Sequence, residues 1–238
     1  GWVELLTPDG AGKIADAVAA RGSHLYSAGV ATADIGALRR HLEGRGVAPP
    51  HEAGQLHLDV ADTGIAGLRV VVSQDEALDV VGDIDFFYEA TLLSKDTGGV
   101  TRALNALFGL NDSYYTEIIS EVFGYRGTLT LFDEDRLDRL EVIDPTTEGT
   151  TMERYFRKFG QSLYMAFAET RDINLIGERA AAAGAGFTVD RPADRPSHLP
   201  ADQIWLHPKA LGGMMLGLSR PSMAWSWSGR PERVEAVV

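Results

Sequence analysis

The feature that most constrains the fold of this chain is an internal repeat. Two dipeptides recur at one offset of 138 residues (163 minus 25, and 172 minus 34): Leu25-Tyr26 as Leu163-Tyr164, and Asp34-Ile35 as Asp172-Ile173. Matches in the same order and at the same spacing indicate that one structural unit is used more than once. The fold is therefore expected to be built from similar modules.

Each copy opens with a single glutamate inside an apolar stretch that ends at proline. Glu4 stands in residues 3–8 and Glu141 in residues 140–145, an offset of 137 (141 minus 4). We expect both stretches to be buried strands, and a charged side chain in a buried strand is costly unless it is paired or bound to a metal. The two glutamates are therefore the first candidates for a functional role.

After the glutamate, both copies follow the same order of elements. A short helix is followed by an alternating strand, an aspartate at the N-cap of an amphipathic helix, a proline-rich turn and an apolar closing strand. In the first copy these elements occupy residues 13–22, 25–31, 34–44 and 67–73, and in the second copy residues 152–160, 163–169, 172–184 and 213–219.

The stretch between the copies has the same order of elements. Residues 85–94 predict a strand, and residues 97–110 predict a helix that ends at Gly109. Three antiparallel strands are expected next, over residues 115–123, 127–133 and 139–145. This order is strand, helix, strand, strand, strand, or βαβββ.

The acidic stretch over residues 73–84 is the expected boundary between two halves. We expect an N-terminal half over residues 1–74, with the last strand of one module and one full βαβββ module. A C-terminal half over residues 83–221 would hold two such modules, and residues 222–238 would form a tail.

Composition narrows the class of partner. The 238 residues include no cysteine, which excludes disulfides, thiolate metal ligands and a cysteine nucleophile. A net charge of −12 argues against nucleic acid or an anionic membrane as the main partner. No apolar run approaches the roughly 18 residues that span a bilayer. We therefore expect a cytoplasmic protein with a small-molecule partner, and the pattern leaves room for a homodimer.

Repeated βαβββ units resemble the vicinal oxygen chelate superfamily, which includes glyoxalases, extradiol dioxygenases, bleomycin resistance proteins and methylmalonyl-CoA epimerase. The most specific local likeness is residues 205–218, WLHPKALGGMMLGL, which look like the His-Pro-Lys, Gly, apolar-strand ending of the epimerase. The resemblance implies an α+β fold of tandem βαβββ modules paired into cup-shaped curved sheets.

The resemblance also implies a divalent metal in the cup, held by residues on the first and last strands of each module. In the C-terminal pair these positions fall on Phe86, Glu141, Met165 and Gly217, and in the N-terminal pair those present fall on Glu4, Ser27 and Val71. Only the two glutamates are usual ligands. We therefore expect a site without the usual metal and without another cofactor.

A cup that keeps a carboxylate but not a metal favours acid–base chemistry. By this resemblance, Glu141 would be the proton-transferring base, and Tyr164 would donate a hydrogen bond in place of the metal. A structural alternative stays open for each: Glu141 solvated or paired with Arg139, and the tyrosines packed in strands. The expected substrate-binding residues are His207, Lys209, Phe86, Met165, Glu4 and Tyr26.

Two functions follow from this interpretation. The first is a glyoxalase-fold enzyme, an isomerase, epimerase or lyase, that moves a proton next to the carbonyl of a small organic acid or thioester. The second is a metal-free protein of the same fold that binds or sequesters an aromatic or hydrophobic small molecule. The sequence contains neither a GxSxG nucleophile motif nor the Lys-Ser/Thr of a phosphate-binding loop, so these two chemistries are not expected.

Overall fold

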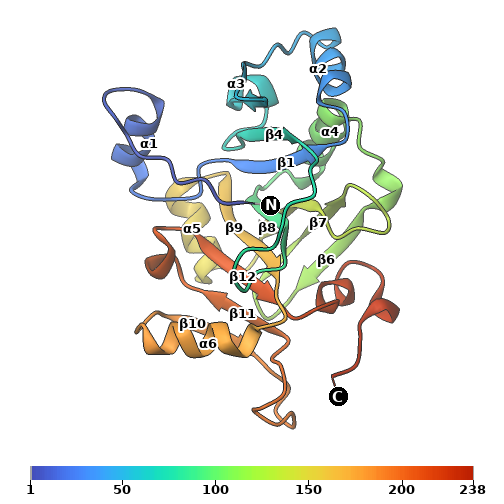
Figure 1. Cartoon of the computed structure of the whole chain (residues 1–238). Coiled ribbons are helices and arrows are strands. Elements are labelled where there is room, and N and C mark those ends of the chain that lie inside the picture. The colour runs from blue at the N-terminus through green and yellow to red at the C-terminus, as the bar shows by residue number, and fades with distance from the viewer. Residues whose placement is uncertain (1, 238) are drawn as a thin grey trace. The chain divides into compact units, whose positions relative to one another are not determined.

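The structure is a computed structural model that describes residues 2–237 (Figure 1). Within these residues the chain forms two compact units, which we name after one helix of each. The α4 unit comprises residues 27–77 and 90–163, and the α6 unit comprises residues up to 26, 78–89 and from 164 onward. Each unit gathers separate stretches of chain, and the boundaries predicted for halves over 1–74 and 83–221 and a tail over 222–238 stay predictions.

The first module of the α4 unit is a four-stranded sheet with strand order β1-β4-β3-β2. The first strand runs parallel to the last, and β3 runs antiparallel to β2 and β4. The elements of this module are β1 (Ala28–Thr32), α2 (Ile35–Gly44), β2 (His51–Glu52), β3 (Gln55–Leu58), α3 (Val60–Thr63) and β4 (Val70–Gln74).

The second module of the α4 unit has strand order β5-β8-β7-β6, with the later half of β5 in this unit. Its helix α4 contacts β7 and β8 and buries Val100, Leu104 and Leu107, as the helical spacing predicts. The elements are β5 (Phe86–Leu93), α4 (Thr97–Phe108), β6 (Thr116–Ser120), β7 (Tyr125–Leu131), β8 (Arg139–Pro145) and, after the module, α5 (Thr151–Phe159).

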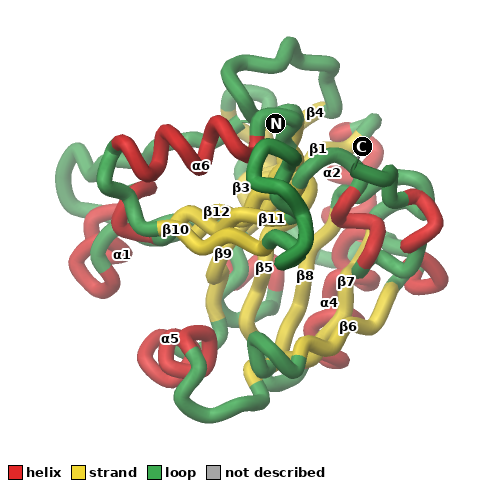
Figure 2. Tube along the Cα trace, turned by 90° about the horizontal axis from the view of Figure 1, so that it is seen from below, coloured by secondary structure: helices red, strands yellow, loops and turns green. Residues whose placement is uncertain are grey.

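The α6 unit contains the third module, with strand order β10-β11-β12-β9 and the first half of β5 beside β9. Figure 2 shows α6 running alongside β10, β11 and β12. The elements are α1 (Lys13–Arg21), β9 (Ser162–Glu169, in this unit from Tyr164), α6 (Ile173–Ala182), β10 (Phe187–Asp190), β11 (Gln203–Leu206) and β12 (Met215–Ser219).

All three modules therefore share one topology, in which the last strand lies beside the first. The prediction of an α+β fold built from βαβββ modules is confirmed. An aspartate stands at the N-cap of each module helix, as the sequence predicts for Asp34 and Asp172. The side chain of Asp34 accepts a hydrogen bond from Ala37 N at 2.7 Å, and that of Asp96 from Gly99 N at 2.8 Å.

One face of the sheet in the α6 unit is covered by α6 and forms an apolar core. Its fully buried members come from β9, α6, β11 and β12 and from the turn before β11: Ala168, Ile173, Ala201, Ile204, Leu216 and Leu218. Phe87 at the start of β5 and Ala166 pack against this cluster. The opposite face of the same strands is the one that α6 does not cover.

The prediction that residues 3–8 form a buried strand, the last strand of an N-terminal module, is wrong. These residues have no regular secondary structure, and Leu5 is 89% exposed. Their repeat counterpart β8 is fully buried because β5 and β7 lie on its two sides. Residues 3–8 belong to none of the sheets of the described chain, so their backbone has no ladder to join.

Candidate functional site

The buried carboxylate of Glu141 is the main candidate for a functional group in the α4 unit. All seven residues of β8 are buried, and Glu141 is 5% exposed. The hydroxyl of Thr91, on the later half of β5, donates a hydrogen bond to Glu141 Oε2 at 2.6 Å. This short contact fixes the orientation of a carboxylate that is removed from solvent, which is the property expected of a proton-transferring group.

Arg139 lies two residues before Glu141 on β8, so strand alternation places both side chains on one face. Arg139 is 2% exposed, and its guanidinium donates to Leu137 O at 3.1 Å. Leu129 of β7 lies directly opposite Glu141. A cation and an anion are thus buried two residues apart on one strand face, which keeps open the predicted alternative in which Arg139 balances the charge of Glu141.

The face of the α6 unit opposite helix α6 is lined by aromatic side chains. Tyr88 stacks on Phe167 with ring centroids 6.1 Å apart and an interplanar angle of 26°, and Phe86 lies 6.1 Å from Tyr88. The hydroxyl of Tyr88 is 3.1 Å from Ser219 Oγ. Met165 shares this face with Phe167 by strand alternation. Phe86 and Met165, two predicted substrate-binding residues, are thus on the same face.

The same face explains why residue 217 is a glycine. Gly217 lies directly opposite Phe167 in the parallel pair of β12 and β9. A Cβ at Gly217 would stand 2.2 Å from Cε1 of the Phe167 ring. The aromatic ring therefore occupies the place where the resemblance implies a metal-ligating side chain.

Tyr164 and Met165 are adjacent in β9, so their side chains point to opposite faces. Tyr164 is buried, and strand alternation puts its side chain on the same face as those of Ala166 and Ala168, which pack in the core beneath α6. The structure therefore does not bring Tyr164 onto the aromatic face of Met165. Its role as a hydrogen-bond donor to substrate stays a prediction.

The other predicted binding residues lie at separate places in the α6 unit. Glu4 is exposed and accepts a hydrogen bond from Trp2 Nε1 at 2.7 Å. The ring of Tyr26 packs edge-on against His24, with centroids 6.3 Å apart. His207 Nε2 lies 3.0 Å from Thr188 Oγ1, and Lys209 is exposed in the short 3-10 helix Pro208–Leu211.

Glu89 is a buried acidic residue that the sequence argument missed. In each module one residue, in the first strand or directly before it, precedes the N-cap aspartate by seven positions (34 minus 27, 96 minus 89, 172 minus 165): Ser27, Glu89 and Met165. The equivalent position in the second module is therefore Glu89, three residues beyond Phe86, and this residue is 6% exposed. A signal existed, because a tyrosine precedes this position in all three modules: Tyr26, Tyr88 and Tyr164.

Two of the four ligand positions in the C-terminal pair of modules do not fit the metal of the superfamily. Met165 and Gly217 offer no oxygen or nitrogen from a side chain, and the ring of Phe167 covers Gly217. Among residues 2–237 no three histidine, aspartate or glutamate side chains come close enough together to hold a metal ion. No helix in this part of the chain is long and apolar enough to cross a membrane.

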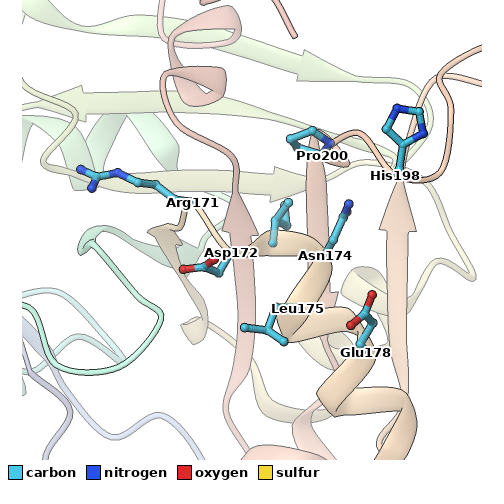
Figure 3. A pocket seen from close by; sticks show the side chains of 8 residues that line it. Arg171, Asp172, Asn174, Leu175, Glu178, His198 and Pro200 are labelled. Carbon is cyan, nitrogen blue, oxygen red and sulfur yellow. The ribbon is translucent and has the colours of Figure 1, made fainter. Parts of the chain in front are cut away.

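A polar hollow of about 310 Å³ opens at the start of α6 (Figure 3). Asn174 points toward the loop that carries His198 and Pro200, and its amide donates to Leu199 O at 3.0 Å. The guanidinium of Arg191 and the backbone N–H of Ala201 both donate to the side-chain oxygen Oδ1 of Asn174. Because these bonds tie the loop to the helix, Asn174 has a structural role.

Glu169, at the end of β9, is a carboxyl group whose pKa is shifted from its ordinary value. Burial raises its pKa above the ordinary value, and the negative charges of Asp85 and Glu235 act in the same direction. The backbone N–H of Ser222, which donates to Glu169 Oε2 at 2.9 Å, and the charge of Arg171 act in the opposite direction. The balance holds the pKa of Glu169 above its ordinary value in the folded protein.

We expect Glu169→Gln to abolish one component of the pH dependence of stability. A carboxyl group with a raised pKa contributes stability that is present below its ordinary pKa and is lost as the pH rises through the folded-state pKa. The amide keeps an acceptor for Ser222 N but carries no charge. At neutral pH the free energy of unfolding of the variant should therefore equal or exceed that of the parent.

Urea unfolding at a series of pH values measures this difference. Glu178→Gln, on the exposed surface of α6, serves as the control. A variant that is less stable than the parent at neutral pH and equally pH-dependent would contradict the expectation.

Comparison with known proteins identifies the fold. No protein-family model and no curated protein matches the sequence. The crystal structure of methylmalonyl-CoA epimerase from Mycobacterium tuberculosis matches with 14% identity and a TM-score of 0.50, over 60% of this chain and 93% of that chain. Epimerases of this type belong to the vicinal oxygen chelate superfamily, so the chain has the glyoxalase-like fold that its sequence predicts.

Two further solved structures are similar at lower TM-scores. A Streptomyces coelicolor methylmalonyl-CoA epimerase in complex with 2-nitronate-propionyl-CoA matches with 16% identity and a TM-score of 0.47, over 58% of this chain and 97% of that chain. A methylmalonyl-CoA epimerase in complex with methylmalonyl-CoA and NH4+ matches with 17% identity and a TM-score of 0.48, over 58% and 94%. At these identities the likeness concerns the fold alone.

Proposed function

We propose that the chain is an enzyme of the glyoxalase-like fold that moves a proton next to the carbonyl of a small organic acid or thioester. The observation that carries the proposal is the buried carboxylate of Glu141, oriented by the hydroxyl of Thr91 at 2.6 Å. Taking an ionised carboxylate out of water is costly, and a strand residue with only a packing role would be apolar. A catalytic role for the carboxylate explains why a charged residue stands at this buried position.

In this proposal Glu141 removes a proton from the carbon next to the carbonyl and leaves an enolate. Isomerisation follows when Glu141 returns the proton to another atom of the enolate, and epimerisation when a donor on the opposite face returns a proton to the same carbon. Thr91 holds the carboxylate oxygen that does not take the proton. Arg139, on the same strand face, supplies positive charge where the carbonyl oxygen becomes more negative. A thioester related to methylmalonyl-CoA is the first substrate to test, because the fold is shared with epimerases that carry that name.

The test is the effect of Glu141→Gln on exchange of the α-proton. Protein and acyl thioester are incubated in deuterated buffer, and loss of the α-proton signal is followed by nuclear magnetic resonance. An amide cannot accept the proton, so we expect the exchange rate to fall by about a thousandfold. Glu117→Gln, which changes an exposed glutamate of the edge strand β6, should leave the rate unchanged.

A folded Glu141→Gln variant that exchanges the proton at the parental rate would overturn this assignment. Circular dichroism and the unfolding midpoint establish that the variant is folded. The variant Thr91→Val is a second test of the site. It removes the hydroxyl but keeps the carboxylate, so it should slow exchange less than Glu141→Gln does.

A second function, binding of an aromatic or hydrophobic small molecule, rests on a different observation. The stacked rings of Tyr88 and Phe167, with Met165 on the same face, form an aromatic surface inside the α6 unit. Native mass spectrometry of the purified chain would detect a co-purified ligand. Retention of that ligand in Glu141→Gln and its loss in Phe167→Ala would favour binding over catalysis. In either case we propose a cytoplasmic protein with a small-molecule partner.

A further inference from the structure

Helix α5 and the strands beside it in the α4 unit present exposed cations above buried carboxylates. Lys95 Nζ lies 2.6 Å from Asp144 Oδ1, Arg126 Nη2 lies 3.6 Å from Asp144 Oδ2, and Arg157 Nη1 lies 3.6 Å from Glu153 Oε1. The side chains of the three cations are 55%, 70% and 62% exposed, whereas those of the two carboxylates are 10% and 17% exposed. The positive charges are therefore the ones that a partner meets.

Two more cations of α5, Arg154 and Lys158, are also exposed. Lys158 Nζ lies 4.8 Å from the ring centroid of Phe159, and Lys95 Nζ lies 5.6 Å from that of Phe156. These cation–π contacts favour positions of the two ammonium groups at the surface of the helix. We call the five cations together the basic patch: Lys95, Arg126, Arg154, Arg157 and Lys158.

An apolar turn borders the basic patch. The turn between β6 and β7 exposes Val122 and Phe123. The next residue, Gly124, accepts hydrogen bonds at its backbone oxygen from Thr146 N at 2.8 Å and from Thr147 N at 3.2 Å, in the loop that leads to α5. Exposed apolar side chains rimmed by charges are typical of a surface that binds another protein.

The basic patch lies at the end of the strands that carry the Glu141 site. Asp144, the partner of Lys95 and Arg126, stands three residues beyond Glu141 on β8, which is about 10 Å along the strand. Lys95 follows Thr91 by four residues, just after the end of β5. A short flexible arm is therefore enough to join the basic patch to the Glu141 carboxylate.

We propose that the basic patch and the apolar turn dock an acidic protein domain that carries the acyl thioester on a flexible arm and presents it to Glu141. The inference rests on the proposed function, because the thioester is the substrate class of that proposal. Positive charge on this chain complements negative charge on the domain. Small free ligands bind mostly in concave sites, whereas the exposed face of a helix suits a protein surface.

The charge of the rest of the chain favours a small domain over nucleic acid or an anionic membrane. The net charge is −12, and two exposed carboxylates, Glu121 and Glu148, lie in the turns beside the basic patch. Salt confines the interaction of exposed charges to about 10 Å at 0.1 M. A small domain therefore meets mainly the basic patch, while an extended anionic surface also meets the acidic remainder.

The first test measures binding without turnover. Holo acyl carrier protein is titrated into the parent and into Glu141→Gln, and binding is followed by isothermal titration calorimetry. We expect a Kd that rises with ionic strength and that rises about tenfold in Arg157→Glu/Lys158→Glu. Arg39→Glu/Arg40→Glu makes the same change of charge at two adjacent exposed arginines of α2 and should retain the parental Kd. Circular dichroism establishes that each variant is folded.

The second test compares exchange of the α-proton for one acyl group carried either by acyl carrier protein or by coenzyme A. The ratio of kcat/KM for the carrier protein to that for coenzyme A should fall about tenfold in Arg157→Glu/Lys158→Glu. Binding of the carrier protein without exchange would contradict the role of Glu141 but keep the docking surface. Exchange of the coenzyme A thioester without binding of the carrier protein would overturn the docking surface but keep the role of Glu141.

Two control probes separate the domain from other anionic partners. A DNA duplex and vesicles of anionic phospholipid are tested with the same variants, and neither is expected to bind. Binding of either probe to the parent, with loss in Arg157→Glu/Lys158→Glu, would overturn the proposal. So would a carrier protein that binds the parent and this double variant with the same Kd.

Discussion

Replacement of Asp202 by alanine is expected to lower the free energy of unfolding by about 3–5 kcal/mol. Asp202 is 8% exposed and accepts hydrogen bonds from Arg220 Nε at 2.7 Å and from Arg195 Nη1 at 2.6 Å. Its backbone is also fixed, since Asp202 N donates to Asp190 O and Arg220 N donates to Asp202 O. Removal of the carboxylate leaves the buried guanidinium of Arg220 without its anion.

The pH dependence of this effect has a defined sign. Burial by itself would raise the pKa of Asp202, but hydrogen bonds and charges from Arg195 and Arg220 outweigh it and hold the pKa below the ordinary value. The stabilisation is therefore present above the ordinary pKa of about 3.9 and is lost as the pH falls through the lower, folded-state value. The difference in stability between parent and Asp202→Ala should narrow in that acid range.

Equilibrium urea unfolding of both proteins from neutral to acid pH measures the difference. Glu43→Ala provides a matched control, because the Arg39–Glu43 pair on α2 has side chains that are 50% and 43% exposed. An exposed pair of this kind contributes less than about 0.5 kcal/mol. An Asp202→Ala variant as stable as Glu43→Ala at neutral pH would show that the buried triad does not stabilise the α6 unit.

Replacement of Gly67 by alanine is expected to destabilise the α4 unit by more than about 3 kcal/mol. Gly67 has a φ of +70°, and a Cβ there would stand 2.0 Å from the backbone oxygen of Gln161. The same two segments are joined by a hydrogen bond from the side-chain amide Nε2 of Gln161 to Ala66 O at 2.9 Å. The overlap is between the added Cβ, whose position the backbone of residue 67 fixes, and the backbone oxygen of Gln161. No side-chain rotation can therefore relieve it.

Gly64→Ala separates backbone strain from overlap. Gly64 ends α3 with a φ of +64°, but no atom lies within 4 Å of a Cβ placed there. This control therefore meets only the conformational cost of the left-handed region, about 1 kcal/mol. Thermal and urea unfolding should rank the parent first, Gly64→Ala second and Gly67→Ala last. Equal stability of the two variants would show that the loop at Gly67 moves away from Gln161 at little cost.

Much of the fold can be predicted from local features of the chain. Asp34 and the left-handed Gly109 mark helix ends that follow from capping and backbone conformation within a few residues. The seven residues of β8 match the predicted stretch, because apolar residues around one charge and a closing proline are a local pattern. Three repeats of one order of elements then predicted the βαβββ topology, which the strand order confirms.

The candidate site was less predictable because burial depends on partners far away in the sequence. Glu4 and Glu141 occupy equivalent positions in the repeat, yet Glu4 is exposed and Glu141 is buried beside Thr91. The difference comes from the strands that flank β8. Phe86 was taken as the equivalent of Met165, but the tyrosine before Glu89 and the helix start at Asp96 both place Glu89 there.

The sequence by itself determined the module, its helix ends and the presence of a glutamate on the last strand of one module. These features depend on periodicity and capping, which act over a few residues. Only the tertiary structure decided that Thr91 orients Glu141 and that the ring of Phe167 covers Gly217. Both contacts join residues on different strands, and their geometry is fixed by sheet register, which no short stretch of sequence encodes.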